Sequence, residues 1–324
     1  MRDGRLLVVC KGDRSLDVLD LRAGASVGTV TSSGHVPHEV VASGDGTICY
    51  LPVYSDSPVG VPGSDGRAID LIDLVSLART ATVTIDYASR PHLPQVGPEG
   101  LLYVSTELDE SLSIFDPDTM RLVARIPTGA AHSHMFAFAP DAATIAVANV
   151  SPGTVSVIDV KSGSLRGIVE VAGRINRIAF DSTGHLAFTA DQERARLAVV
   201  DTRTMSVAGW IDLPGIGFGS AVTKDGKYLV IALRSASQIA ILDLANRSVV
   251  AAIDVPAHPQ AIVLDPNGRY AYSACDVSDV VVEVDLEQLR VMRVIPTGRN
   301  PDGLAWAPLP AKPSSKGAHP DAAH

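Results

Sequence analysis

Short apolar runs of five or six residues recur along the chain, and Gly, Asp, Asn or Pro bounds each of them. Examples are LLYVST at residues 101–106, IAVANV at 145–150 and YAYSAC at 270–275. Alternating β-branched and aromatic residues favour strands, and the bounding residues favour tight turns. No stretch combines a 3.6-residue apolar period with helix caps. The pattern therefore predicts an all-β protein.

A longer repeat organises these runs. Units built around a D-G or N-G type of turn begin every 42 residues from position 92 to position 302, and the interval from 38 to 92 is 54, which is 42 plus an insertion of 12. Each unit holds four short strands, and a period in the low forties with four strands is typical of a β-propeller. The equivalent first residues of the units are His38, His92, His134, Asn176, Phe218, Gln260 and Asp302.

The two ends of the repeat region predict how the ring closes. Residues 5–32 begin with a second strand that lacks a first, and residues 302–308 (DGLAWAP) form a first strand that lacks the rest. Pairing the two completes a seventh blade and leaves no open edge between the first and last blades. We therefore expect a seven-bladed β-propeller over residues 1–309, with four antiparallel strands per blade. The Pro/Ser/Ala-rich residues 310–324 are expected to form a disordered tail.

The same units resemble a known family. YVST at Tyr103–Thr106, IAVANV at Ile145–Val150 and VIDV at residues 157–160, followed by a fourth strand that ends in Gly, resemble the YVTN-type repeat propellers. These are bacterial seven-bladed proteins related to the lactonase-like propellers. The resemblance covers residues 4–308 and implies the fold. Because family members include enzymes and electron-transfer domains, and because the motif is structural, the resemblance assigns no catalytic residue.

Composition narrows the classes of partner. The chain carries 27 Lys and Arg against 36 Asp and Glu, a formal charge of −9, and contains no basic run. We therefore expect neither a nucleic-acid nor a membrane partner. No apolar stretch approaches the roughly 20 residues of a membrane helix. The N-terminal apolar run of five residues is too short for a signal peptide, which predicts a cytoplasmic location. Three cysteines without a C-x-x-C pair are expected to be buried, reduced thiols: Cys10, Cys49 and Cys275.

Histidines gather at one predicted rim. The first strand of each propeller blade lines the channel, so its first residues converge at the channel mouth. Because the ring closes, Asp302 lies on the blade next to that of His38, and four consecutive blades present Asp302, His38, His92 and His134. Three imidazoles and a carboxylate suit a divalent transition metal, such as Zn, Cu, Fe or Ni, with one open position. We predict His38, His92 and His134 as metal ligands, and Asp302 as a fourth ligand or a base. Six of the nine histidines lie in or just after the connections that enter the first strands: His35, His38, His92, His132, His134 and His258.

Two further features fall on the same rim. The insertion, residues 54–67, belongs to a connection between second and third strands that opens there, so it could act as a lid. The ends of the second strands reach the same rim, and they place Glu107 beside the blade of His92 as a candidate general base or partner of a ligand. The other second-strand ends contribute Asn149, Asp191, Arg234 and Asp276.

These residues support three hypotheses of function. The first is a metal-dependent enzyme that acts on a small molecule at the channel mouth by hydrolysis, elimination or oxidation. The second is a non-catalytic propeller that binds a partner or metabolite, and the third is a metal-free, lactonase-like hydrolase that uses His and Asp. The sequence leaves the oligomeric state open and is compatible with a monomer. The Asp that recurs at the end of each third strand is expected to cap a turn.

Overall fold

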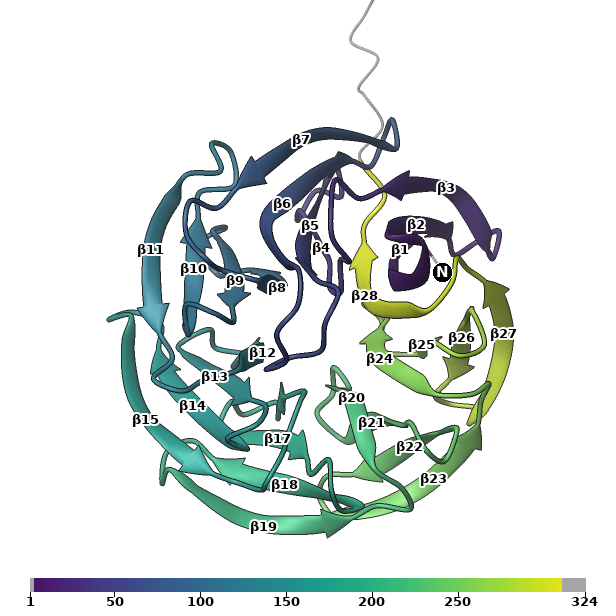
Figure 1. Cartoon of the computed structure of the whole chain (residues 1–324). Coiled ribbons are helices and arrows are strands. Elements are labelled where there is room, and N and C mark those ends of the chain that lie inside the picture. Colours follow the sequence, from purple (N-terminus) through teal and green to yellow (C-terminus); the bar gives the residue numbers. More distant parts are fainter. Residues whose placement is uncertain (1–2, 311–324) are drawn as a thin grey trace, which may run out of the picture.

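The computed structural model describes residues 3–310 and has the predicted architecture (Figure 1). Seven antiparallel sheets of four strands follow one another around a central axis in the described part of the chain. We number them blades 1 to 7, starting from the sheet that contains both β1 and β28 and following the chain. The all-β, seven-bladed fold is thereby confirmed. One short 3-10 turn, η1 (Lys11–Asp13), follows β1.

In each blade the strands run from the axis outward. The innermost strands of blades 1 to 7 are β28 (Pro301–Ala307), β4 (Val41–Ala42), β8 (Pro91–Val96), β12 (Ser133–Phe138), β16 (Ala179–Phe180), β20 (Gly217–Val222) and β24 (Pro259–Leu264). The second strands are β1 (Arg5–Cys10), β5 (Ile48–Ser55), β9 (Leu102–Thr106), β13 (Thr144–Asn149), β17 (Leu186–Ala190), β21 (Tyr228–Leu233) and β25 (Tyr270–Cys275).

The outer half of each blade holds the remaining strands. The third strands are β2 (Ser15–Asp20), β6 (Asp65–Asp73), β10 (Ser111–Phe115), β14 (Thr154–Asp159), β18 (Arg196–Asp201), β22 (Gln238–Asp243) and β26 (Val280–Asp285). The outermost strands are β3 (Ala25–Thr31), β7 (Ala78–Thr84), β11 (Leu122–Pro127), β15 (Ser164–Glu170), β19 (Ser206–Asp212), β23 (Ser248–Asp254) and β27 (Arg290–Pro296).

The hydrophobic core lies between the blades. Seven clusters of buried side chains occupy the seven interfaces between neighbouring blades in the described residues. Leu7 and Leu16 of blade 1, for example, share a cluster with Leu51 and Ile72 of blade 2. Second and third strands are buried on both faces, which is why their sequences are the most continuously apolar. The three cysteines are free and buried, as predicted.

The recurrent aspartates cap turns, as expected from their position. The Asp73 carboxylate accepts hydrogen bonds from the backbone N–H groups of Val75 (2.9 Å) and Ser76 (2.6 Å). Asp285 does the same in blade 7, with the N–H groups of Glu287 and Gln288, both at 2.9 Å. These carboxylates stabilise the turns between third and outermost strands, so they belong to the scaffold.

Terminal strands close the ring. β28 pairs with β1 in antiparallel register, from Arg5 opposite Ala307 to Cys10 opposite Pro301 (Figure 1). Gly303 joins this blade to blade 2: its N–H donates a 3.0 Å hydrogen bond to the His38 carbonyl, and a Cβ at this position would lie 2.3 Å from that oxygen. Apart from Pro310, the tail predicted over residues 310–324 lies outside the described residues. No helix in the described chain has the length and apolar character that crossing a membrane requires.

The inner strands become irregular at the channel mouth. In five of them the pairing register shifts at the residue that the repeat selects, for example around His92 between Pro91 and Pro94, and around His134 between Ser133 and Met135. In blades 2 and 5 the inner strand is only two residues long and starts after His38 and Asn176. These bulges and shortened strands release the mouth residues from strict alternation between two faces.

Candidate functional site

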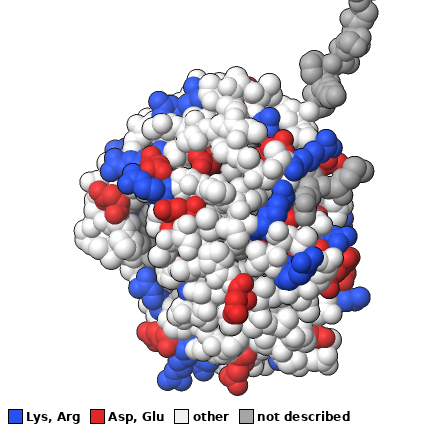
Figure 2. Space-filling view, turned by 90° about the vertical axis from the view of Figure 1, so that its right-hand side faces the viewer, with Lys and Arg blue, Asp and Glu red and all other residues white. Residues whose placement is uncertain are grey.

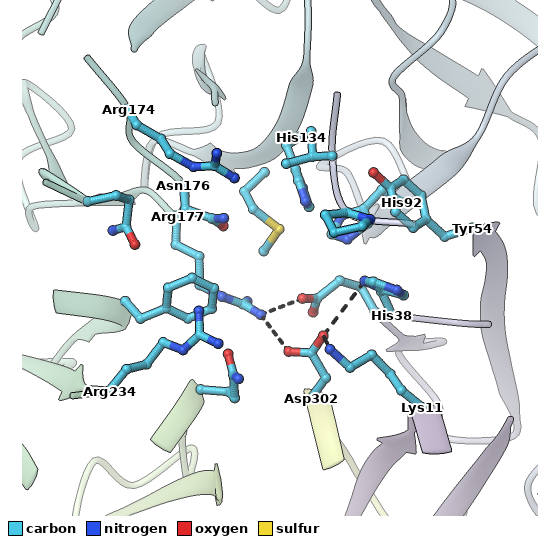
Figure 3. Close-up of a pocket in the computed structure, with 17 residues that line it drawn as sticks. Lys11, His38, Tyr54, His92, His134, Arg174, Asn176, Arg177, Arg234 and Asp302 are labelled. Atoms are coloured by element: carbon cyan, nitrogen blue, oxygen red, sulfur yellow. Dashed lines mark hydrogen bonds and ion pairs between the residues drawn. The ribbon is translucent and has the colours of Figure 1, made fainter. Parts of the chain in front are cut away.

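The channel mouth holds a cavity of about 200 Å³ (Figure 3). All seven residues selected by the repeat lie at this end of the inner strands and line the cavity: His38, His92, His134, Asn176, Phe218, Gln260 and Asp302. In Figure 3 the histidines and Tyr54 lie on one side of the cavity, and Arg174, Arg177 and Arg234 lie on the other. The structure thus brings four of the five predicted site residues together, and Glu107 is not among those that line this cavity.

Three imidazoles and one phenol form the histidine side of the cavity. The ring centroids of His92 and His134 are 3.7 Å apart and nearly perpendicular, and those of His38 and His92 are 5.5 Å apart. Tyr54, from the end of β5, lies 4.7 Å from His38 and 4.6 Å from His92 between ring centroids. The repeat supplies the histidines from blades 2, 3 and 4, whereas Tyr54 arrives through the start of the insertion.

His92 and His134 are buried, His38 is half-buried, and all three are neutral. Burial lowers the pKa of His38 to about 4 and that of His134 to about 3, and it also holds the pKa of His92 well below its ordinary value. For His92 and His134 the neighbouring imidazoles act in the same direction. The Nδ1 atoms of His92 and His134 are buried without a hydrogen-bond partner in the described structure. A buried polar atom without a partner is costly, so these two nitrogens mark a place where a ligand would be stabilising.

Asp302 is the centre of an ion-pair network. Its carboxylate lies 3.0 Å from Lys11 Nζ, 3.5 Å from Arg177 Nη2 and 3.7 Å from His38 Nδ1. Burial on its own would raise the pKa of Asp302, but Lys11 and Arg177 outweigh that effect and hold the pKa below its ordinary range. The carboxylate is therefore ionised and paired, which suits orientation of His38 better than proton abstraction.

Glu39 is a second carboxylate that the sequence did not single out. It follows His38 directly and binds Arg177, with Oε1 2.5 Å from Nη2. Burial raises the pKa of Glu39 to about 7, against the attraction of Arg177. Glu39 and Arg177 occupy the same repeat position in blades 2 and 5, one residue after the predicted ring, so their ion pair spans the channel.

Arginines and an aromatic ring form the opposite side. The guanidinium carbon of Arg234 lies 4.5 Å from the centroid of the Phe218 ring, and that of Arg177 lies 5.3 Å from the same centroid. Arg234 is half-buried, and burial lowers its pKa despite the more distant carboxylates of Asp276 and Asp302. Within the described residues, the side chains of Arg234 and Arg174 form neither a hydrogen bond nor an ion pair. We call Arg174, Arg177, Arg234 and Phe218 the cationic side.

The insertion is fixed over the mouth by buried charges. Arg90, 2% exposed, donates to Asp65 (2.7 Å), to the Val61 carbonyl (2.8 Å) and to Glu107 (3.1 Å). The Glu107 carboxylate also accepts hydrogen bonds from the Gly60 N–H at 2.7 Å and from the Tyr54 hydroxyl. We call Arg90, Glu107 and Asp65 the insertion clamp. It holds Pro58 and Val59 against the cavity, and in Figure 1 this loop reaches the centre of the ring.

The contacts of the insertion clamp explain why Glu107 does not line the histidine cavity. The Glu107 carboxylate accepts a hydrogen bond from the Tyr54 hydroxyl and lines a neighbouring cavity of about 340 Å³ with Arg90 and His132. His132 packs against Gly60, whose φ of +73° and whose lack of a Cβ allow this contact, since a Cβ would lie 2.7 Å from the imidazole. His258, another of the predicted rim histidines, has its Nδ1 2.5 Å from the Asp276 carboxylate. The geometry thus places Glu107 as a tether of the insertion.

Metal ligation is not preformed. Within residues 3–310, no group of three or more His, Cys, Asp or Glu side chains is already placed so that it could hold a metal ion. A metal bound by all three imidazoles would therefore require these side chains to rearrange. Residues that the sequence analysis missed at this site are Lys11, Glu39, Tyr54, Arg174 and Arg177.

Comparison with known proteins supports the fold. No family model and no curated protein matches this chain. Among solved structures, Kuenenia stuttgartiensis hydrazine synthase aligns with a TM-score of 0.68 at 17% identity, over 85% of this chain and 91% of that chain. Dihydro-heme d1 dehydrogenase NirN in complex with DHE also aligns with a TM-score of 0.68, at 16% identity, over 94% of this chain and 75% of that chain. At such low identity these similarities show the propeller fold and nothing about chemistry.

Proposed function

We propose that this protein is a metal-dependent enzyme that acts on a small molecule at the channel mouth, with the metal bound by His38, His92 and His134. The observation that carries the proposal is the pair of buried Nδ1 atoms in His92 and His134 that lack a hydrogen-bond partner, beside a third neutral imidazole. Neutral imidazole is the form that binds a metal, and a set of three histidines suits Zn, Cu, Fe or Ni. Two propeller enzymes of similar fold make a catalytic role compatible with the architecture.

Each residue at the mouth then has a role. A bound divalent metal would polarise a carbonyl or lower the pKa of a water molecule. Asp302, held by Lys11 and Arg177, orients His38 through its Nδ1 at 3.7 Å. Tyr54 packs against all three imidazoles and restricts the directions in which they can turn. The insertion clamp fixes the loop that carries Pro58 and Val59, which line the cavity.

Cavity size limits the substrate. About 200 Å³ lies below the roughly 300–1,000 Å³ of pockets for drug-sized ligands. The substrate is therefore a compact molecule, and a group as large as the heme named for one of the similar structures does not fit this cavity. We also propose that the chain is related to the YVTN-type repeat propellers, on the basis of the repeat motifs alone.

A metal-free hydrolase is the second candidate. The absence of a preformed metal cluster among the described residues, together with the proximity of His38 to Asp302, favours it. In that case a neutral imidazole would act as the base and Asp302 would orient it. The two candidates share the site and differ in whether metal is present.

Elemental analysis of protein purified without a histidine tag tests the proposal. We expect about one equivalent of a transition metal per chain, lost in His92→Phe and His134→Phe, because either change removes one of three ligands. His185→Phe is the matched control, since His185 is exposed in a turn outside this cavity. Wild-type protein that binds no Zn, Cu, Fe or Ni, even after addition of the ions, would refute the metal and leave the metal-free hydrolase.

A further inference from the structure

Charge at the channel mouth is opposite to that of the whole protein. The cavity is lined by four cationic side chains, Lys11, Arg174, Arg177 and Arg234, and by two carboxylates, Glu39 and Asp302. The chain as a whole carries −9. On the side face in Figure 2, Lys and Arg are interspersed with Asp and Glu, and broad uncharged areas lie between them. An excess of positive charge gathered in a concave site attracts anions.

The excess charge belongs to two specific arginines. Lys11 and Arg177 are paired with Asp302 and Glu39. Arg234 contacts the face of Phe218, and its Nε is buried without a hydrogen-bond partner in the described structure. Arg174 lines the same cavity from the connection before Asn176, and within the described residues its side chain is likewise unpaired. A guanidinium held against an aromatic ring keeps its planar donors available for an oxyanion.

Geometry separates this region from the histidines. Arg174 and Arg234 project into the cavity from one side, and His92 and His134 face them from the other (Figure 3). The cationic side is therefore the charged feature that a bound molecule meets opposite the histidines. A compact molecule with an anionic group can thus bind the arginines and present its remaining atoms to the imidazoles.

We propose that the substrate is a small organic anion and that Arg234 and Arg174 bind its carboxylate or phosphate group. That the anion is a substrate rests on the proposed function. That an anion binds here rests only on the residues of the cationic side. Asn176, Gln192 and Gln260 add amide groups to the lining, which suits a polar molecule. Arg234 supplies the half-buried contact, and Arg174 supplies the contact at the rim.

Calorimetric titration of the metal-free protein tests the site without any need for activity. The probes are succinate, inorganic phosphate and the neutral succinamide. We expect succinate or phosphate to bind and succinamide not to bind, and the comparison of the first two tells carboxylate from phosphate recognition. Arg234→Gln should weaken binding of the preferred anion by about tenfold or more, because it removes a charge-assisted contact. Arg234→Lys should recover only part of the affinity, since lysine keeps the charge and loses the planar donors.

Controls keep the outcomes distinct. Arg166→Gln makes the same change of charge on the exposed outermost strand β15 and should leave binding unchanged. Arg174→Gln, at an exposed position, tests the site if Arg234→Gln fails to fold, and it should weaken binding several-fold. Equal affinities for the anions and succinamide, or equal losses in Arg234→Gln and Arg166→Gln, would overturn the anion site. Anion binding by a protein that takes up no metal would support the anion site and refute the metal proposal.

Discussion

The channel mouth contains two arginines, the buried Arg90 and the half-buried Arg234, that differ in how their charge is compensated. In the insertion clamp, Arg90 reaches two carboxylates and a backbone carbonyl. On the cationic side, Arg234 contacts an aromatic face and, within the described residues, forms no hydrogen bond or ion pair with an anion; the carboxylates of Asp276 and Asp302 act on it only through longer-range electrostatics. Desolvating a charge is unfavourable unless partners compensate for it. The comparison therefore separates a charge that stabilises the fold from one that is left for a ligand.

Replacing Arg90 should give the largest effect. Arg90→Met leaves Glu107 buried without its cation, and we expect a loss of about 3–5 kcal/mol in the free energy of unfolding. Urea denaturation measures it. The double variant Arg90→Met/Glu107→Gln should lose less than the single variant, because no buried charge then remains unpaired. A loss below about 1 kcal/mol in Arg90→Met would show that the clamp is not a stabilising unit.

Replacing Glu107 sharpens the same point. Glu107→Gln removes charge-assisted hydrogen bonds to the Gly60 N–H and to Arg90, so we expect a loss of about 1–3 kcal/mol in the free energy of unfolding. Bound metal per chain should stay as in the wild type, because Glu107 does not line the cavity that the histidines line. Loss of metal without loss of stability would instead place Glu107 at the reacting centre, as the sequence analysis considered.

Arg234 should behave in the opposite way. In ligand-free protein, Arg234→Gln should lower the free energy of unfolding by no more than about 0.5 kcal/mol, since no ion pair is broken. Urea denaturation beside Arg90→Met measures the contrast directly. A loss comparable to that of Arg90→Met would mean that Arg234 has a structural partner, and the distinction between the two regions would fail.

Added anion should produce a modest effect of the opposite sign. Succinate or phosphate at ten times its dissociation constant should stabilise wild-type protein by about 1.4 kcal/mol. Arg234→Gln should show less stabilisation at the same concentration, and the difference should shrink with added sodium chloride as charges are screened. Thermal unfolding with and without the anion provides the measurement, and equal stabilisation of both proteins would argue against binding at Arg234.

The repeat predicted the fold because the same pattern of four short strands and their turns recurs in each of the seven blades. Equal spacing along the chain becomes a circle in space, which is why His38, His92, His134 and Asp302 could be expected at one cavity. The repeat did not predict that the residues directly after these positions would also line the cavity. Strict alternation would turn Glu39, Met135 and Arg177 away from the channel, yet bulges and shortened strands at the mouth bring them into it.

Other site residues depend on long-range contacts that spacing does not encode. Tyr54 enters through the insertion, which the repeat does not describe, and Lys11 enters through the closure of blade 1. The expectation that Glu107 lies near the histidines followed from its position at a strand end. The direction of its side chain is set by Arg90 and Gly60, and nothing in the repeat reveals those contacts.

The pairing of β1 with β28 brings together residues of the channel mouth from the two ends of the described chain. Lys11 and Asp302 stand 291 positions apart in the chain, yet their side chains meet at 3.0 Å once that ladder forms. A molecule whose first and last strands have come apart loses Lys11 from beside Asp302, although Gly303 still joins β28 to the His38 carbonyl. The ion-pair network around Asp302 is thereby complete only when the ring of blades is closed.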